Sequence, residues 1–411
     1  MLKIENIKLS PGAPRSGLTA EAARLLRVRE ADVLSLRVLR RSVDARDGVF
    51  MVYTVEVSVK DEAAAARRCR SKRVSLSVPR PAYALPAPRP APERAPVVVG
   101  AGPAGLFCAL VLARAGLRPI LLERGRPVEA RQADVERFWS AGALDPSSNV
   151  QFGEGGAGAF SDGKLNTGTK DPRHRFILEQ LVSCGAPEDI LTDAKPHVGT
   201  DYLHAVLKNL RRELLRLGAD IRFETRLTDL DIRQGRLTGI AAEGPEGSAP
   251  LPCSHLALCP GHSARDTFAM LHARGVRLEA KPFAVGVRIE HRQSDCDAAQ
   301  YKQYAGHPGL PASTYKLSCH LSGGRSAFSF CVCPGGEVVA AASEEHQVVT
   351  NGMSEFARAR ENINGALLVN VTPEDFGGDS PLAGIDFQRR LERAAYALGG
   401  GGYLAPAQRV G

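Results

Sequence analysis

The sequence predicts an α/β protein with a Rossmann-type dinucleotide-binding domain, a mixed β-rich domain after it and an N-terminal ferredoxin-like α+β domain. Three observations predict this class. Residues 97–124 read as strand, glycine-rich turn, helix and strand, residues 1–78 alternate strands with helices, and strand patterns dominate after about 275. The 411 residues, 44% of them apolar and 24% charged, suit a globular chain of two or three domains.

Residues 1–78 predict a small domain with the order β-α-β-β-α-β, which is typical of a ferredoxin-like sandwich. We expect its first helix to be capped near Thr19. Residues 79–96 are rich in proline and predict a semi-extended linker. The six segments that carry the pattern are "LKIENIKL", "TAEAARLLRV", "DVLSLRVLRRSV", "VFMVYTVEVSV", "DEAAAARRC" and "VSLSV".

The stretch "VVVGAGPAGLFCALVLARAGLRPILLER", residues 97–124, carries a Gly-x-Gly-x-x-Gly turn between a β-branched strand and a helix. Gly100 permits the tight turn, Gly102 lets the backbone approach a pyrophosphate, and Gly105 lets helix and strand pack closely. Glu123 ends the second strand, where a carboxylate accepts hydrogen bonds from a ribose diol. The predicted cofactor-binding residues of this unit are Gly100, Gly102, Pro103, Ala104, Gly105, Glu123 and Arg124.

Residues 95–113 carry no charge and are almost long enough for a short membrane span. The glycines and Pro103 interrupt that run, and a second apolar strand follows one helix length later, as a βαβ unit requires. We therefore expect no membrane segment here.

The central and later segments predict further helices at 129–142, 201–220 and 386–398 and a strand meander at 221–242. We place the first part of the dinucleotide-binding domain at 97–274 and the substrate domain at 275–411. Residues 149–168 are dense in glycine, which is typical either of a backbone wrapped around a ligand or of a flexible surface loop.

The nine cysteines form no disulfide framework and no metal-ligand spacing, which predicts a cytoplasmic protein without a metal. Cys331 and Cys333 are the only close pair, and we interpret them as packed thiols, with a redox pair as the alternative. The net charge of +8 includes the cluster "RRCRSKR", residues 67–73, which fits a solvated helix end or a contact surface for acidic partners.

Several stretches resemble those of the uncharacterised bacterial FAD-dependent dehydrogenases whose later half is the "FAD-dependent protein, C-terminal" domain. The resemblance implies FAD rather than NAD, a glutathione-reductase-type flavin domain interrupted by a substrate domain, and an oxidoreductase whose substrate is not established. The matching stretches are "RRSVDAR", "VVVGAGPAGLFCAL", "SNVQFGEGGAGAFSDGKLNT", "GHSARDTF", "KPFAVGVRIEH", "FCVCPGGEVVAAASEE", "VVTNGMS" and "PLAGIDFQRRLERAAY".

The same resemblance implies further residues beside the flavin. Lys164 is the candidate for stabilising negative charge on a reduced flavin, with a surface lysine as the alternative. His262 is the candidate proton donor, with a histidine that bonds loop carbonyls as the alternative. We expect Arg265 and Asp266 to pair with each other or cap a helix. The other implied cofactor contacts are Gly155, Gly156, Ala157, Gly158, Ser161, Asp162 and Gly261.

Members of that family continue past the "APAQ" segment with a late glycine-rich segment that returns to the flavin domain. We therefore expect part of the far side of the FAD site to be missing from residues 1–411. No second nicotinamide motif is evident, so the expected partners are an unknown small-molecule substrate and an external electron donor. The alternatives are a flavin-containing RNA-associated or RNA-modifying protein and an inactive flavoprotein fragment. The basic stretches lack interleaved aromatic residues, which argues against nucleic acid as a binding partner.

Overall fold

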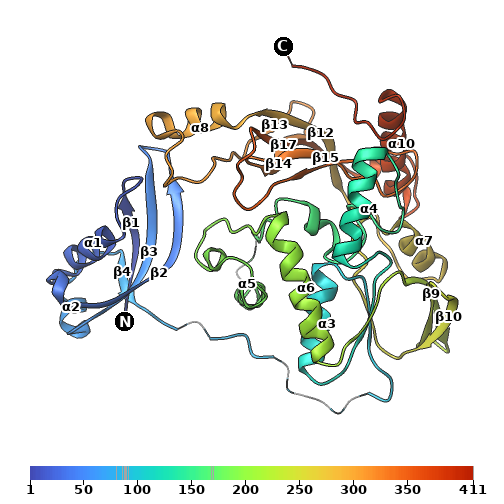
Figure 1. The fold of residues 1–411 in the computed structure, drawn as a ribbon, viewed down its shortest axis with the longest axis horizontal. Coiled ribbons are helices and arrows are strands. Elements are labelled where there is room, and N and C mark those ends of the chain that lie inside the picture. The colour runs from blue at the N-terminus through green and yellow to red at the C-terminus, as the bar shows by residue number, and fades with distance from the viewer. Residues whose placement is uncertain are drawn as a thin grey trace.

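The computed structural model describes residues 1–410 apart from positions 80, 86, 88, 89, 91, 168 and 170. Figure 1 shows a small N-terminal sandwich at one end, a central α/β region, and a further β-sheet that lies above the central helices. Five of these seven excepted positions lie in the expected linker, residues 79–96. Its described residues form no helix or strand.

The N-terminal sandwich is one antiparallel sheet with strand order β2-β3-β1-β4, covered by two helices. The element order is the one expected from the sequence. Thr19 does not cap the first helix, because the helix begins one turn earlier, after Pro14 and Arg15. The elements are β1 (Leu2–Leu9), α1 (Ser16–Leu26), β2 (Val33–Asp44), β3 (Phe50–Val59), α2 (Glu62–Arg68) and β4 (Val74–Leu76).

Strand β2 docks the sandwich on the central region through Arg41. The Arg41 amide donates to the carbonyl of Thr192 at 2.8 Å, and its carbonyl accepts from the Ala194 amide at 2.9 Å. The guanidinium also pairs with Asp189 and Asp193. The sandwich therefore contacts the body of the chain through backbone pairing as well as charge.

The central region contains a parallel sheet of four strands in the order β11-β5-β6-β7. Residue 220 was expected to end a helix and residues 221 and 222 to begin the strand meander, but all three extend this sheet instead. A parallel neighbour requires a crossover, and the long helix before these residues supplies it. The strands are β5 (Val97–Val99), β6 (Ile120–Leu122), β7 (Asp220–Arg222) and β11 (Leu256–Leu258).

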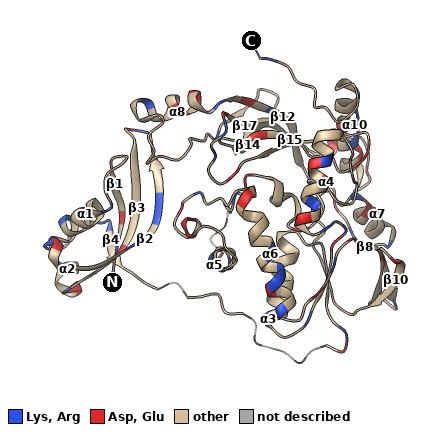
Figure 2. Cartoon of the chain, viewed as in Figure 1, with Lys and Arg blue, Asp and Glu red and all other residues tan. Residues whose placement is uncertain are grey.

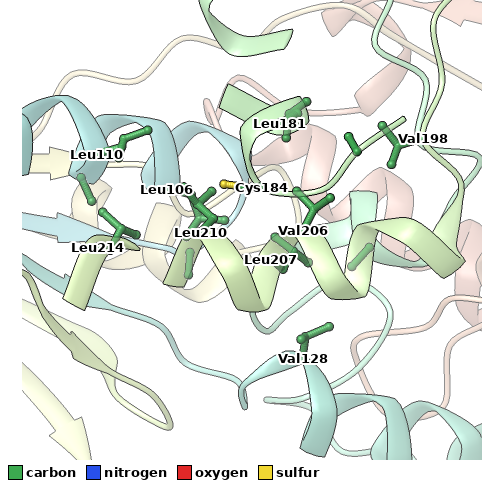
Figure 3. Packing of buried hydrophobic residues seen from close by; sticks show 14 of the residues in the cluster. Leu106, Leu110, Val128, Leu181, Cys184, Val198, Val206, Leu207, Leu210 and Leu214 are labelled. Atoms are coloured by element: carbon green, nitrogen blue, oxygen red, sulfur yellow. The ribbon is translucent and has the colours of Figure 1, made fainter. Parts of the chain in front are cut away.

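The two faces of the parallel sheet are covered differently. One face packs on helices α3 (Pro103–Arg114), α5 (Arg173–Ser183) and α6 (Thr200–Arg216), and Figure 3 shows the leucine and valine side chains that fill this core. The other face packs on α7 and on an antiparallel meander. These elements are β8 (Arg226–Arg233), β9 (Arg236–Gly244), β10 (Gly247–Pro252) and α7 (Arg265–Ala273).

The later residues form a four-stranded antiparallel sheet with the order β12-β17-β14-β13, a separate hairpin β15-β16, and three helices. Pairing between β14 and β17 is interrupted after Phe330 by a bulge that ends at Cys333. The elements are β12 (Phe283–Arg292), α8 (Gln293–Tyr301), β13 (Ser318–His320), β14 (Ser326–Cys333), β15 (Glu337–Ala340), β16 (Thr350–Met353), β17 (Asn362–Val371), α9 (Pro373–Phe376) and α10 (Ala383–Leu398).

Figure 2 shows basic and acidic residues close together on most helices. Among the helices within the described residues, none has both the length and the apolar character needed to cross a membrane. In the same part of the chain, no group of three or more His, Cys, Asp or Glu side chains is arranged to hold a metal ion.

The core beneath the parallel sheet provides a test of this packing. Leu214 is fully buried on α6, while its neighbour Leu215 is 52% exposed. We expect Leu214→Ala to lower the free energy of unfolding by about 2–5 kcal/mol, because it removes buried methyl groups and leaves a cavity. Leu215→Ala is the matched control, with an expected change within about 0.5 kcal/mol. Urea unfolding followed by circular dichroism measures both, and equal effects would contradict the packing described.

Candidate functional site

A cavity of about 390 Å³ opens at the carboxyl ends of strands β5, β6 and β11. The chain runs outward from β5 through β6 to β7 and then returns to the opposite side of β5 as β11. Such a reversal leaves a crevice beyond the carboxyl ends of the strands, which is where ligands bind in open α/β sheets. The cavity is lined by Gly100, Gly102, Pro103, Ala104, Glu123, Arg124, Phe152, Gly156, Ala157, Gly158, Gly261 and His262, among other residues.

The glycine turn has the geometry that its spacing predicted. Gly100 has φ +97°, and a Cβ there would lie 2.2 Å from the carbonyl oxygen of Cys259. A Cβ on Gly105 would lie 1.7 Å from the Gly100 carbonyl oxygen. A Cβ on Gly102 would meet only the Gly156 Cα at 3.9 Å. Gly100 and Gly105 are therefore required by the fold, whereas Gly102 keeps space open in the cavity.

Helix α3 begins directly at this turn, with Gly102 as its N-cap residue and Pro103 in the first position. The first turn of a helix leaves N–H groups without intrahelical acceptors, and the helix dipole places partial positive charge there. The turn thus presents an anion-binding helix terminus to the cavity.

Glu123 lines the cavity and is only 5% exposed. Its carboxylate accepts from the backbone amides of Ala101 at 2.7 Å, Gly125 at 2.9 Å and Gly153 at 3.0 Å. Glu123 therefore ties the glycine turn to the second glycine-rich segment, a structural role that the sequence did not predict. Its position at the end of β6 is the one expected for contact with a ribose.

Arg124 also lines the cavity, and its guanidinium lies 4.3 Å from the ring centroid of Phe152. It donates to Asp266 at 2.8 Å. The expected pairing of Arg265 with Asp266 was therefore wrong. Arg265 is buried and contacts Glu344 at 2.9 Å and Glu392 at 2.7 Å, because these carboxylates approach it from distant segments.

The second glycine-rich segment forms the opposite wall of the cavity and is held from below by Arg131. This arginine is fully buried on α4 (Val128–Ala141). Its guanidinium donates to the carbonyl oxygens of Asn149 at 2.8 Å, Val150 at 3.0 Å, Glu154 at 2.6 Å and Gly156 at 2.9 Å. The segment is thus an anchored wall, and the alternative of a flexible surface loop does not describe residues 149–156.

Arg131 also explains one of the glycines. Gly153 has φ +117°, and a Cβ there would lie 2.4 Å from the Arg131 Cδ. Burial lowers the pKa of Arg131 to about 10, which still leaves the guanidinium charged at neutral pH. Sequence reasoning missed this residue because an arginine on an amphipathic helix is ordinarily exposed.

Glu154 lies in the same wall and is 1% exposed. It accepts from the Val128 amide at 2.8 Å and lies 3.2 Å from the Arg211 guanidinium. Burial raises the pKa of Glu154 to about 6, and the Val128 hydrogen bond and Arg211 only partly offset this effect. The wall therefore contains a carboxyl group that titrates just below neutral pH.

His262 stands at the rim of the cavity with its side chain still accessible. Its Nε2 lies 3.3 Å from the Ser263 hydroxyl. Desolvation by the cavity walls, together with the Arg265 charge, lowers the pKa of His262. The imidazole is therefore mainly neutral at neutral pH and can accept a proton there.

Four residues implied by the resemblance lie apart from the cavity lining. A Cβ on Gly155 would meet the Leu207 side chain at 2.4 Å, so this glycine serves helix packing. The Ser161 hydroxyl donates to the Gly158 carbonyl at 2.9 Å. Asp162 and Lys164 pair with each other at 2.7 Å and belong to a separate cluster.

The cavity also includes residues that sequence reasoning did not single out. They lie at or after the ends of β7 and β11 or, in the case of Gln151, within the glycine-rich stretch, so only the tertiary structure brings them together. Their place beside a short apolar strand or within that stretch was the only signal in the sequence. They are Gln151, Thr225, Arg226, Leu227, Leu258, Cys259, Pro260 and Thr267.

Comparison with known proteins identifies the family. Residues 282–411 match the family described as "FAD-dependent protein, C-terminal domain-like". Residues 96–159 match the family described as "FAD binding domain", and residues 1–58 match a domain of unknown function. An uncharacterized protein of Clostridium beijerinckii is 45% identical over 413 residues, an alignment that covers 100% of this chain and 77% of the relative. The chain belongs to this family of FAD-dependent proteins.

Solved structures show more distant likenesses. The THI4 structure from Thermovibrio ammonificans is 16% identical, with a TM-score of 0.32, and covers 46% of this chain and 64% of its own. A geranylgeranyl bacteriochlorophyll reductase-like protein of Thermoplasma acidophilum is 12% identical, with a TM-score of 0.34, and covers 74% of this chain and 60% of its own.

FAD is the cofactor of this family, and the residues of the cavity fit it. The open side of Gly102 leaves room for a pyrophosphate at the start of α3, and Glu123 closes the cavity where a ribose is expected. On the opposite side, the wall at Gly156–Gly158 adds a surface whose only side chain is the methyl group of Ala157.

The buried carboxyl of Glu154 makes the stability of this FAD-dependent protein depend on pH. The folded state binds this proton more tightly than the unfolded state, whose pKa is near 4.5, so stability falls as pH rises from about 4.5 through about 6. We expect Glu154→Gln to remove this loss. Relative to the wild type, the variant should gain about 2 kcal/mol between pH 4.5 and 7.

Urea unfolding at several pH values measures this difference. Glu246→Gln, a change in the exposed turn between β9 and β10, is the control that should leave the pH profile near the wild-type one. Parallel profiles for the wild type and Glu154→Gln would show that Glu154 is not a protonated buried group.

Proposed function

We propose that this protein is an FAD-dependent oxidoreductase that acts on a small molecule in the cavity at the carboxyl ends of β5, β6 and β11. The observation that carries the proposal is the combination, in one cavity, of an open Gly102, the exposed start of α3 and the carboxylate of Glu123. In this proposal the parallel sheet with its meander is a glutathione-reductase-type flavin domain, and the later antiparallel sheet is the substrate domain.

Each part of the cofactor has a matching part of the cavity. The amides at the start of α3 are positioned to bind the pyrophosphate, and Glu123 to bind the ribose diol. Arg124, stacked on Phe152, provides a flat cationic surface near the ribose. The carbonyl-anchored segment at Gly156–Gly158 and the turn at Gly261 and His262 are the surfaces left for the flavin side.

FAD, when bound, supplies the redox chemistry, and the chain supplies orientation and proton handling. His262 is the residue of the rim that can accept or return a proton, because it is exposed and its pKa is lowered. Lys164 was the sequence candidate for stabilising negative charge on a reduced flavin. Its side chain contacts Asp162 and Cys333, and it is not among the residues that line the cavity. We therefore propose His262 alone for proton transfer.

An absorbance spectrum tests the function most directly. The purified chain is mixed with FAD, separated from free FAD by gel filtration, and then titrated anaerobically with NADH or NADPH. We expect retained flavin and loss of its absorbance on reduction. A chain that is folded but retains no FAD at saturating cofactor would contradict the proposal.

Gly102→Val tests the pyrophosphate position. The added isopropyl group would occupy the open side of the turn without meeting the protein core. We expect a folded chain that no longer retains FAD. Gly323→Val is the control, because a Cβ at Gly323 meets nothing within 4 Å and Gly323 does not line the cavity. Full flavin occupancy in Gly102→Val would show that the pyrophosphate binds elsewhere.

Glu123→Ala tests the ribose position. Charge-assisted hydrogen bonds contribute about 1.5–3 kcal/mol each, so losing the carboxylate should weaken FAD binding at least about tenfold. Glu123→Gln preserves the side-chain shape and separates loss of charge from loss of the turn. Glu213→Ala, on the surface of α6, is the control. Fluorescence titration with FAD measures all three, and an unchanged affinity in Glu123→Ala would remove the ribose role.

A further inference from the structure

Cys331 and Cys333 end strand β14 at the bulge that interrupts its pairing with β17. Cys331 has φ +46°, a left-handed conformation that is unusual for a residue other than glycine. Cys331 is half-buried, whereas Cys333 is fully buried. A regular strand would place the two side chains on one face, whereas at the bulge the two residues differ in burial.

Two cations converge on the buried sulfur. The Lys164 Nζ lies 3.5 Å and the Arg288 Nη2 lies 3.6 Å from the Cys333 Sγ. Arg288 is fixed by bonds to the Cys331 carbonyl at 2.9 Å and to the Asn364 side-chain oxygen at 2.8 Å. The absence of a side chain at Gly352 makes room for Arg288, because a Cβ there would lie 2.0 Å from its Nη2.

The carboxylates around this cluster are too few to balance its cations. Asp162 is 1% exposed and pairs with Lys164 at 2.7 Å and with Arg358 at 2.5 Å. Within the described residues, Arg288 makes no ion pair with a carboxylate. Lys164 and Arg358 thus share one carboxylate and Arg288 has none, and a thiolate would supply the anion that the cluster lacks.

The two cations contact the Cys333 sulfur, whereas the thiol whose pKa is lowered is Cys331, because the two thiols titrate as one coupled pair. Hydrogen bonding from Cys333, aided by Lys164 and Arg288 and opposed by burial and by Asp162, lowers the pKa of the Cys331 thiol to about 6. The same hydrogen bond, with burial, raises the pKa of Cys333. The two sulfurs therefore hold one thiolate and one thiol at neutral pH, and they titrate as a unit.

We propose that Cys331 and Cys333 are a redox-active dithiol that reduces low-molecular-weight disulfides, with Cys331 as the attacking thiolate and Cys333 as the resolving thiol. The accessible position of Cys331 and the buried position of Cys333 fit these two roles. Lys164 and Arg288 favour a disulfide that carries carboxylates. The proposal takes up the redox pair that the sequence left as the alternative to two packed thiols.

The reaction balances without another reagent. The Cys331 thiolate attacks one sulfur of the small disulfide, forms a mixed disulfide, and releases the other half as a thiolate that takes up a proton. Cys333 then loses its proton and attacks the Cys331 sulfur, which releases the second half as a thiol. The small disulfide is reduced to two thiols, and Cys331–Cys333 is oxidised to one disulfide.

Glutathione disulfide is the probe for the test. The wild-type chain of residues 1–411, first reduced and freed of reductant, is incubated with it anaerobically at pH 7 and analysed by peptide mass spectrometry. We expect an internal disulfide that links Cys331 to Cys333, and one disulfide reduced per chain. The Cys333→Ser variant should stop at a mixed disulfide of glutathione on Cys331. A wild-type pair that stays reduced, or glutathione found mainly on the exposed Cys319, would overturn the proposal.

Alkylation of the wild-type chain gives a readout that needs no variant. At pH 6.5 a thiol with a pKa near 6 has a far larger thiolate fraction than an ordinary thiol, which its lower nucleophilicity only partly offsets. We expect iodoacetamide to label Cys331 about fivefold faster than Cys319, although Cys319 is the more exposed. Lys164→Met should move the pH profile of Cys331 labelling to higher pH. Slower labelling of Cys331 than of Cys319, or an unmoved profile, would contradict the thiolate assignment.

Discussion

The buried guanidinium of Arg131, bonded to four backbone carbonyls, is the contact on which the shape of the cavity depends. A charge without water is costly unless hydrogen bonds replace its hydration, and the carbonyls of residues 149–156 provide them. In return, the guanidinium satisfies carbonyls that a glycine-rich segment cannot bond within a helix or strand. The segment is therefore rigid where it faces the cavity, although its glycine content alone would favour mobility.

Glu123 extends this arrangement across the cavity. It bonds Ala101 in the first glycine turn and Gly153 in the second segment, so one carboxylate fixes the distance between the two walls. In the proposed function the same carboxylate also bonds the ribose of FAD, so one side chain would serve both the fold and the cofactor.

The chain places a second set of buried charges outside the FAD cavity. Asp162 and Lys164 follow the cavity wall directly in sequence, and they reach the bulge of β14 rather than the cavity. The segment from Gly156 to Lys164 therefore links the proposed flavin site to the proposed dithiol along one stretch of chain. Arg265 is another buried charge that does not line the cavity, and carboxylates from distant segments pair with it.

The sequence by itself determined the local units. The glycine spacing, the strand at Val97–Val99, the helix stripe ending at Leu214 and the N-terminal β-α-β-β-α-β order follow from backbone conformation and hydrophobic periodicity, which act over a few residues. The residues Gly100, Gly102, Gly105 and Glu123 were predictable for the same reason. Tertiary structure alone decided that Arg131 anchors the glycine segment, that Arg265 pairs with Glu344 and Glu392, and that Lys164 and Arg288 meet Cys333. These contacts join residues far apart in the chain, and a charged side chain carries no local signal of which distant partner will replace its water.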